Sequence, residues 1–173
     1  SAASDVYKRQ LEKAINDSNA KNILELGVYL GYSTIRILRN LDNFSKLTSI
    51  ESNKKFAEIA KEHIKISGLS ENHELLIGKT TQIIPTLDEK FDFIFIDHWK
   101  DLYLEDLKML ERKKLIKHNA WIFADNVILF NLEDYLGYVR SSPNYQSKFI
   151  STKREYSKSH PDGIEISIFK DEI

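Results

Sequence analysis

Residues 91–101 read Phe-Asp-Phe-Ile-Phe-Ile-Asp-His-Trp-Lys-Asp, and residues 121–126 read Trp-Ile-Phe-Ala-Asp-Asn. Each stretch is a short run of apolar and aromatic side chains that stops at a carboxylate. Continuous apolar runs of this length are typical of parallel strands that are buried on both faces of a sheet. The two stretches therefore predict neighbouring buried strands of a parallel sheet.

The polar residues that end these two runs form a candidate site. Ligands of open α/β sheets bind beyond the carboxyl ends of the strands. Two neighbouring strands would therefore bring Asp97, Asp125 and Asn126 to one place, with Lys100 a turn away. Hard oxygen ligands beside one amine predict a divalent-metal site with a base next to it.

The remainder of the chain alternates between strand-like and helix-like segments. Strands are expected at residues 22–26, 47–51, 74–77, 91–96, 121–124, 148–153 and 164–169, and helices at 11–17, 33–41, 54–66, 81–87, 102–116 and 132–139. Such alternation predicts an α/β fold, a Rossmann-like doubly wound sheet of seven strands with right-handed crossovers. The last two strands leave no room for a helix between them. The sheet is therefore expected to be mostly parallel with an antiparallel last strand.

The composition is that of an ordinary globular domain. The 173 residues are 29% charged and 42% hydrophobic, with a formal net charge of -1. These values predict one domain and give no global signal for nucleic acid or membrane. No stretch approaches the roughly 18 apolar residues of a membrane-spanning helix. Because the chain has no cysteine, a metal would be held by oxygen or imidazole. We expect a cytoplasmic location.

The first ten residues read Ser-Ala-Ala-Ser-Asp-Val-Tyr-Lys-Arg-Gln and lack an initiator methionine. They resemble the translation of a transposase adapter used to prepare DNA sequencing libraries. We therefore expect residues 1–10 to be a non-native leader and residues 11–173 to be a single catalytic domain. The alternative is a native first turn of the helix that follows. Recovery of a longer gene with these ten residues intact would exclude the adapter interpretation.

A second candidate site lies at the first strand-to-helix turn. Gly27 and Gly31 have the spacing G-x-x-x-G, which differs from the G-x-G-x-x-G dinucleotide fingerprint. Glycines here let a ligand approach the backbone and the positive end of the next helix. Glu51 ends the next strand, about 24 residues further on, where an acidic residue binds ribose hydroxyls. Taken singly, the glycines could simply end a strand and Glu51 could face solvent, but together they favour a nucleotide-like ligand.

These features together resemble the catechol O-methyltransferase family, which uses S-adenosylmethionine on the class I methyltransferase fold. The resemblance runs from about Leu24 to the end of the chain. It is strongest at residues 24–33, 97–104, 124–128 and 162–165. It is closer to the animal-type catechol enzymes than to the plant caffeoyl-CoA branch.

The resemblance implies a role for each matching position. Asp97, Asp125 and Asn126 become Mg²⁺ ligands, an assignment that agrees with the prediction from the strand ends. Both oxygens of a vicinal aromatic diol would complete the coordination, and the metal would favour the phenolate. Lys100 would accept the proton, helped by the nearby dication. The alternatives are helix capping by Asp125 and Asn126, and a surface salt bridge at Lys100.

The resemblance also assigns the two organic ligands. The cofactor residues would be Gly27, Tyr29 and Ser33 at the methionine end, Glu51 at the ribose, and Thr80, Thr81, His98 and Trp99 around the adenine, with Asp97 beside them. The substrate residues would be Lys100, Asn126, Phe130 and Glu155. Phe130 stands where the family has a proline, and Glu155 lies in a segment that departs from the family pattern. His98 has an alternative role as a strand-end histidine, and Trp99 as a core residue.

Three other functions compete with a catechol methyltransferase. A methyltransferase of the same fold could act on a hydroxylated tRNA base, and Lys148, Lys153, Arg154 and Lys158 form a modest basic cluster. Such clusters are usually solvated, so the expected partner is a small molecule. A dehydrogenase is disfavoured by the glycine spacing. If the family's N-terminal helices are missing, the chain could also be a fragment with little activity.

Overall fold

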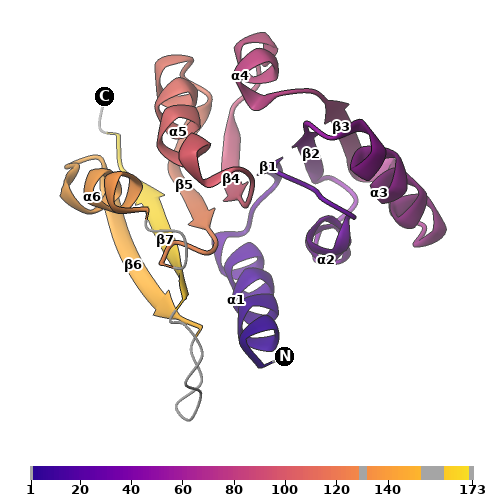
Figure 1. Ribbon diagram of the computed structural model, residues 1–173, viewed down its shortest axis with the longest axis horizontal. Coiled ribbons are helices and arrows are strands. Elements are labelled where there is room, and N and C mark those ends of the chain that lie inside the picture. Colours follow the sequence, from indigo (N-terminus) through magenta and orange to yellow (C-terminus); the bar gives the residue numbers. More distant parts are fainter. Residues whose placement is uncertain (1, 129–131, 153–161, 172–173) are drawn as a thin grey trace.

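The computed structural model describes residues 2–128, 132–152 and 162–171 (Figure 1). The described α-helices are α1 (Ala2–Ser18), α2 (Tyr32–Arg39), α3 (Lys54–Ile66), α4 (Thr80–Ile83), α5 (Tyr103–Arg112) and α6 (Glu133–Ser141). The strands are β1 (Asn22–Leu26), β2 (Lys46–Glu51), β3 (His73–Ile77), β4 (Phe91–Ile96), β5 (Ile116–Ala124), β6 (Tyr145–Ser151) and β7 (Gly163–Phe169). Short 3₁₀ turns lie at η1 (Ser70–Asn72), η2 (Ile84–Thr86) and η3 (Lys100–Leu102).

The strands form one seven-stranded sheet in the order β3-β2-β1-β4-β5-β7-β6. Strands β1 to β5 pair in parallel. Strand β7 inserts between β5 and β6 and runs antiparallel to both. The predicted fold is therefore confirmed, including its reversed last strand. The order changes direction between β1 and β4, and this is where an open α/β sheet binds its ligand.

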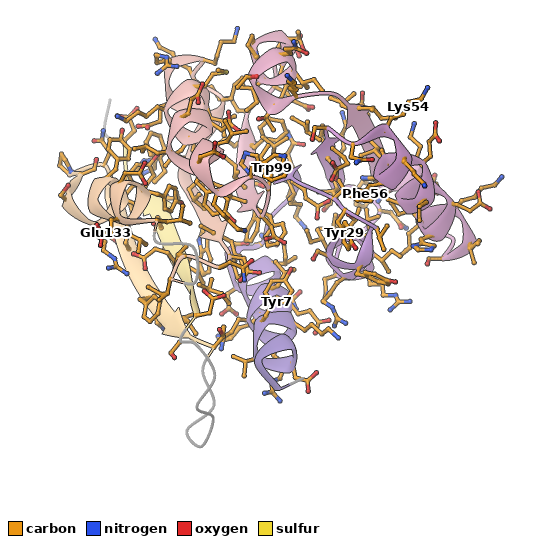
Figure 2. The ribbon with its side chains drawn as sticks, in the orientation of Figure 1. Tyr7, Tyr29, Lys54, Phe56, Trp99 and Glu133 are labelled. Atoms are coloured by element: carbon orange, nitrogen blue, oxygen red, sulfur yellow. The ribbon has the colours of Figure 1, made fainter. Side chains whose placement is uncertain are left out.

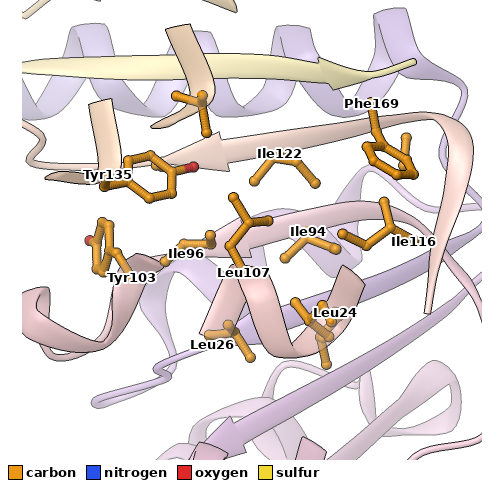
Figure 3. Close-up of a cluster of buried hydrophobic side chains, with 14 of the residues drawn as sticks. Leu24, Leu26, Ile94, Ile96, Tyr103, Leu107, Ile116, Ile122, Tyr135 and Phe169 are labelled. Carbon is orange, nitrogen blue, oxygen red and sulfur yellow. The ribbon is translucent and has the colours of Figure 1, made fainter. Parts of the chain in front are cut away.

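The two faces of the sheet carry separate apolar clusters. Ile94 and Ile96 of β4 point to the face covered by α5 and α6, where Leu107 packs on them (Figure 3). Phe93 and Phe95 point to the other face and pack with residues of α1, α2 and α3. All of these side chains are fully buried. Burial on both faces explains why β4 reads as a continuous apolar run.

The predicted boundary between α5 and β5 was wrong. The helix ends at Arg112 instead of continuing to residue 116, because Lys114 takes a left-handed conformation with φ 57°. Strand β5 then begins at Ile116, before the apolar run. Its first part is irregular, since Asn119 has φ 66° and the register with β4 shifts there. Strand β6 likewise begins at Tyr145 instead of residue 148.

Helix α1 is longer than expected and includes most of the first ten residues. Within this segment the Tyr7 ring lies 6.3 Å from the Phe95 ring and 6.4 Å from the Phe123 ring, measured between centroids. Packing contacts do not test whether a segment is native. The non-native origin of residues 1–10 therefore stays a prediction. Across the described part of the chain, no helix combines the length and apolarity needed to cross a membrane.

Candidate active site

A pocket of about 900 Å³ opens at the carboxyl edge of the sheet, beside the ends of β1, β2, β3 and β4. Its lining includes all nine predicted cofactor residues, which are Gly27, Tyr29, Ser33, Glu51, Thr80, Thr81, Asp97, His98 and Trp99. Trp99 is 70% exposed and Tyr29 57% exposed. Figure 2 draws Trp99 over the β4 side of the molecule, and Tyr29 with Phe56 over the α2 and α3 side. Trp99 is therefore a rim residue, and its alternative role as a core residue is wrong.

The turn after β1 requires glycine at position 27. Gly27 has φ 93°, and a Cβ there would lie 2.8 Å from the Asp97 carbonyl oxygen and 2.9 Å from the His98 Cβ. Tyr29 adopts φ 55°, a strained conformation that is common at functional sites. The turn that leads into α2 therefore lies directly against the end of β4, where Asp97, the first predicted metal ligand, is located.

Glu51 holds this turn by accepting hydrogen bonds from backbone amides. Its Oε1 lies 3.1 Å from the Val28 nitrogen and 2.8 Å from the Tyr29 nitrogen. Its Oε2 lies 2.8 Å from the Asn53 nitrogen. A carboxylate has about four lone-pair positions, so Glu51 retains capacity for ligand hydroxyls. Glu51 thus has a structural role in the turn that the sequence did not predict.

Beneath the turn, Glu25 is a fully buried carboxyl group. Its Oε1 accepts hydrogen bonds from Thr34 Oγ1 at 2.7 Å and from Ser49 Oγ at 2.8 Å. Removal from water raises the pKa of Glu25 to about 8, despite these two hydrogen bonds. Glu25 is therefore mostly protonated at pH 7, so the end of β1 beneath the turn carries little charge from it.

The ends of β4 and β5 bring the predicted metal ligands together. Asp125 is 8% exposed, and burial followed by repulsion from Asp97 raises its pKa. Burial also raises the pKa of Asp97, against the opposing charge of Lys100. Two carboxylates that disfavour each other's charge need a cation nearby. Their acceptor oxygens are the type that Mg²⁺ prefers.

Lys100 lies among these oxygens at the start of η3. Its Nζ lies 3.2 Å from Asp97 Oδ1 and 3.3 Å from Asn126 Oδ1. It also lies 2.7 Å from the Tyr103 hydroxyl, which donates to the Asp125 carbonyl oxygen at 2.8 Å. The side chain of Lys100 is 20% exposed and forms an ion pair with Asp97, so Lys100 does make a salt bridge, but a partly buried one at the strand end.

Asn126 presents its amide oxygen to Lys100 because its amide nitrogen is held elsewhere. Nδ2 donates to Asp162 Oδ2 at 2.8 Å, and the backbone has φ 56°, which asparagine tolerates. Asp162 also accepts from the amide of Ile128 at 3.3 Å. Asp162 therefore orients a predicted metal ligand, as carboxylates commonly do around metals.

The predicted metal set is two carboxylates and one amide. Within the described ranges, no group of three or more His, Cys, Asp or Glu side chains is arranged as a metal cage. Asp97, Asp125 and Asn126 nevertheless supply oxygen donors only, and burial, followed by the neighbouring charge of Asp97, raises the pKa of Asp125. The donor chemistry thus fits a hard divalent cation.

Three residues of the site were missed by the sequence prediction: Tyr103, Asp106 and Asp162. Tyr103 and Asp162 lie inside stretches that carry the family resemblance, so a signal for them existed. Asp106 lies on α5 and is fully buried, which nothing in the sequence indicated. Two predicted substrate residues, Phe130 and Glu155, lie outside the described residues, as do Lys153, Arg154 and Lys158 of the basic cluster.

Comparison with known proteins places the chain among methyltransferases. The sequence model of a family described as O-methyltransferase matches residues 7–151. Catechol O-methyltransferase B of Danio rerio is 38% identical over 164 residues, which cover 92% of this chain and 62% of that protein. Catechol O-methyltransferase of Mus musculus is 34% identical over 187 residues, covering 97% of this chain and 70% of that protein. The chain thus spans less than two thirds of the Danio rerio relative.

Three further matches are a relative named for a transmembrane form and two solved structures. A Mus musculus protein named transmembrane O-methyltransferase homolog is 31% identical over 89% of this chain and 62% of its own length. An O-methyltransferase from Bacillus cereus, solved in complex with SAH, has a TM-score of 0.85 at 23% identity and covers 95% of this chain and 81% of its own. A Streptomyces achromogenes O-methyltransferase, solved with SAM, has a TM-score of 0.85 at 24% identity over 95% and 80%. At these identities the two structures support the fold.

Proposed function

Because the chain belongs to the O-methyltransferase family, we propose that it transfers a methyl group from S-adenosylmethionine to one hydroxyl of a catechol-type substrate. The reaction would depend on Mg²⁺ and use Lys100 as the general base. The observation that carries the proposal is the position of Lys100 Nζ, 3.2 Å from Asp97 Oδ1 and 3.3 Å from Asn126 Oδ1. Lys100 is thus close enough to take a proton from a hydroxyl group that is bound next to Asp97 and Asn126.

The pocket supports the first half of this proposal, which is donor binding. Gly27, Tyr29 and Ser33 would receive the methionine end, and Glu51 the ribose. Thr80, Thr81, His98 and Trp99 would enclose the adenine. A volume of about 900 Å³ is in the range of pockets that bind drug-sized ligands.

The ligand set at β4 and β5 supports the second half, which is acceptor activation. Asp97, Asp125 and Asn126 would hold Mg²⁺, which when bound supplies positive charge that favours a phenolate. Lys100 would remove the proton from the reacting hydroxyl. Tyr103 positions Lys100 by accepting its hydrogen bond at 2.7 Å. The protein then contributes chiefly by aligning the oxygen with the donor and excluding water.

Phe130 and Glu155 are proposed to contact the substrate on the grounds of the resemblance. Lack of cysteine and ordinary composition support a cytoplasmic location, although one relative is named for a transmembrane form. A small molecule is proposed as substrate because the relatives are named for catechol. A hydroxylated tRNA base stays the alternative, and RNA binding that weakens steeply with salt would favour it.

The test is methylation of two isomers that differ only in the spacing of their hydroxyls. We expect catechol, with adjacent hydroxyls, to be methylated in the presence of Mg²⁺, with the product detected by mass spectrometry. Resorcinol, with separated hydroxyls, should react far more slowly because it cannot offer two adjacent oxygens. Equal rates on both isomers would exclude binding of a vicinal diol. An absence of product from catechol would contradict the proposed activity.

A further inference from the structure

Asp106 is a buried carboxylate that lies behind the proposed donor pocket and contacts two residues of its lining. It lies on α5 with no exposed surface. Its Oδ2 lies 2.6 Å from Thr80 Oγ1 and 2.6 Å from His98 Nε2, and both of these residues line the pocket. Among the described residues, its Oδ1 has no hydrogen-bond partner. Burying a carboxylate with an unpaired oxygen costs stability, so the arrangement calls for a functional reason.

The carboxylate fixes the direction of both hydrogen bonds. An ionised carboxylate only accepts, so the single hydroxyl hydrogen of Thr80 must point to Asp106. His98 must likewise carry its hydrogen on Nε2. The His98 ring is held in place by stacking on Tyr103, with centroids 5.5 Å apart and planes 9° from parallel. The Thr80 oxygen can therefore offer only lone pairs to a ligand in the pocket.

We propose that Asp106 is a positioning residue that makes Thr80 a hydrogen-bond acceptor, so that the pocket selects a 6-aminopurine over a 6-oxopurine. The inference rests on the proposed function, which puts the purine of the methyl donor beside Thr80. A 6-amino group donates hydrogen bonds to such an acceptor. A 6-oxo group presents an oxygen, and its ring carries a hydrogen on N1, so the polarity of that edge is reversed. Two facing acceptors repel, which is how a polar site rejects the wrong ligand.

The test compares the affinities of S-adenosylhomocysteine and S-inosylhomocysteine, measured by isothermal titration calorimetry on the full chain. For the wild type we expect the adenosyl compound to bind about tenfold to a hundredfold more tightly. Asp106→Leu removes the acceptor and lets the Thr80 hydroxyl rotate, so the ratio should fall toward one. Asp106→Asn should keep most of the ratio, because its amide oxygen can take the position of Oδ2.

Thr80 provides a second pair of variants in case Asp106→Leu does not fold. Thr80→Val removes the hydroxyl at nearly constant volume and should reduce the ratio, whereas Thr80→Ser keeps the hydroxyl and should preserve it. Glu105→Gln, an exposed neighbour on α5, is the control and should leave both affinities unchanged. A loss of packing alone would weaken both ligands together and leave their ratio intact.

Each result has a defined meaning. An unchanged ratio in folded Asp106→Leu or in Thr80→Val would overturn the inference, as would a wild type that binds both compounds equally. The proposed function would survive either result, since the adenosyl compound would still bind. If the wild type bound neither compound, the proposed function would fail and the inference with it.

Discussion

The two halves of the candidate active site are stabilised by different means. On the β1 and β2 side, Glu51 is satisfied by three backbone amides and Glu25 is kept neutral by burial. On the β4 and β5 side, the carboxyls of Asp97 and Asp125 repel each other and depend on the ammonium of Lys100. The β1 and β2 side, called the donor half after its proposed ligand, is therefore complete by itself, whereas the β4 and β5 side is completed by a cation. Variants in each half should thus fail in different ways.

The largest effect on activity should come from Lys100→Ala. Loss of a general base lowers a rate by roughly 10²–10⁴-fold, so kcat for catechol methylation should fall by that factor. Binding of S-adenosylhomocysteine should change little, because Lys100 does not line the donor pocket. Lys113→Ala, an exposed position after α5, is the matched control. If S-adenosylhomocysteine affinity fell by as large a factor as kcat, the two halves would not be separate.

The pH dependence of stability should identify Glu25 in the donor half. Its pKa is raised from 4.5 to about 8 in the folded state, so the folded protein holds this proton more tightly than the unfolded chain does. Stability should therefore fall as pH rises from about 4.5 to about 8, by on the order of a few kcal/mol. Thermal unfolding of Glu25→Gln should show a flatter pH profile, with or without Mg²⁺. A profile as steep as that of the wild type would contradict the assignment.

Gly27→Ala should destabilise the junction between the two halves. The new Cβ would meet the Asp97 carbonyl oxygen at 2.8 Å, in a backbone with φ 93°. We expect a loss of about 2 kcal/mol in the free energy of unfolding. Gly137→Ala on α6 is the control, since a Cβ there has no neighbour within 4 Å and Ala favours the helix. Denaturant unfolding measures both, and equal stability of the two variants would remove the steric argument.

Glu51→Gln should have the smallest effect and should be confined to the donor half. An amide retains one acceptor oxygen, so the turn loses only part of its support. We expect about tenfold weaker binding of S-adenosylhomocysteine, which corresponds to about 1.4 kcal/mol. The KM for catechol should stay constant. Glu58→Gln, exposed on α3, controls for the loss of charge. If Glu51→Gln changed the KM for catechol more than the affinity for S-adenosylhomocysteine, the assignment of Glu51 to the donor half would be wrong.

The strand ends and the glycine spacing in the sequence predict the fold and the place of the candidate site. Buried parallel strands have a distinctive apolar pattern, so the meeting of Asp97 with Asp125 followed from the fold rules alone. Asp106 could not be found in this way, because its partners Thr80 and His98 come from two other segments. Their proximity is a property of the packed fold and of α5 in particular.

The same limit explains the error at β5. Residues 111–119 are mostly polar and have no alternation that marks a strand, so the sequence places them partly in the preceding helix. The left-handed conformations of Lys114 and Asn119 end the helix and kink the strand. Lys114 is not a residue type that marks a left-handed conformation, and an asparagine such as Asn119 tolerates this conformation without requiring it. Tertiary pairing with β4 determines this strand more than local propensity does.

The most direct test of the account is the methylation of catechol by the wild-type chain with Mg²⁺ and after its removal by a chelator. We predict that product formation stops without the metal and returns when Mg²⁺ is added back, while S-adenosylhomocysteine binding stays within about threefold throughout. Methylation that continues at the same rate in the chelated protein would contradict the assignment of Asp97, Asp125 and Asn126 to a catalytic metal.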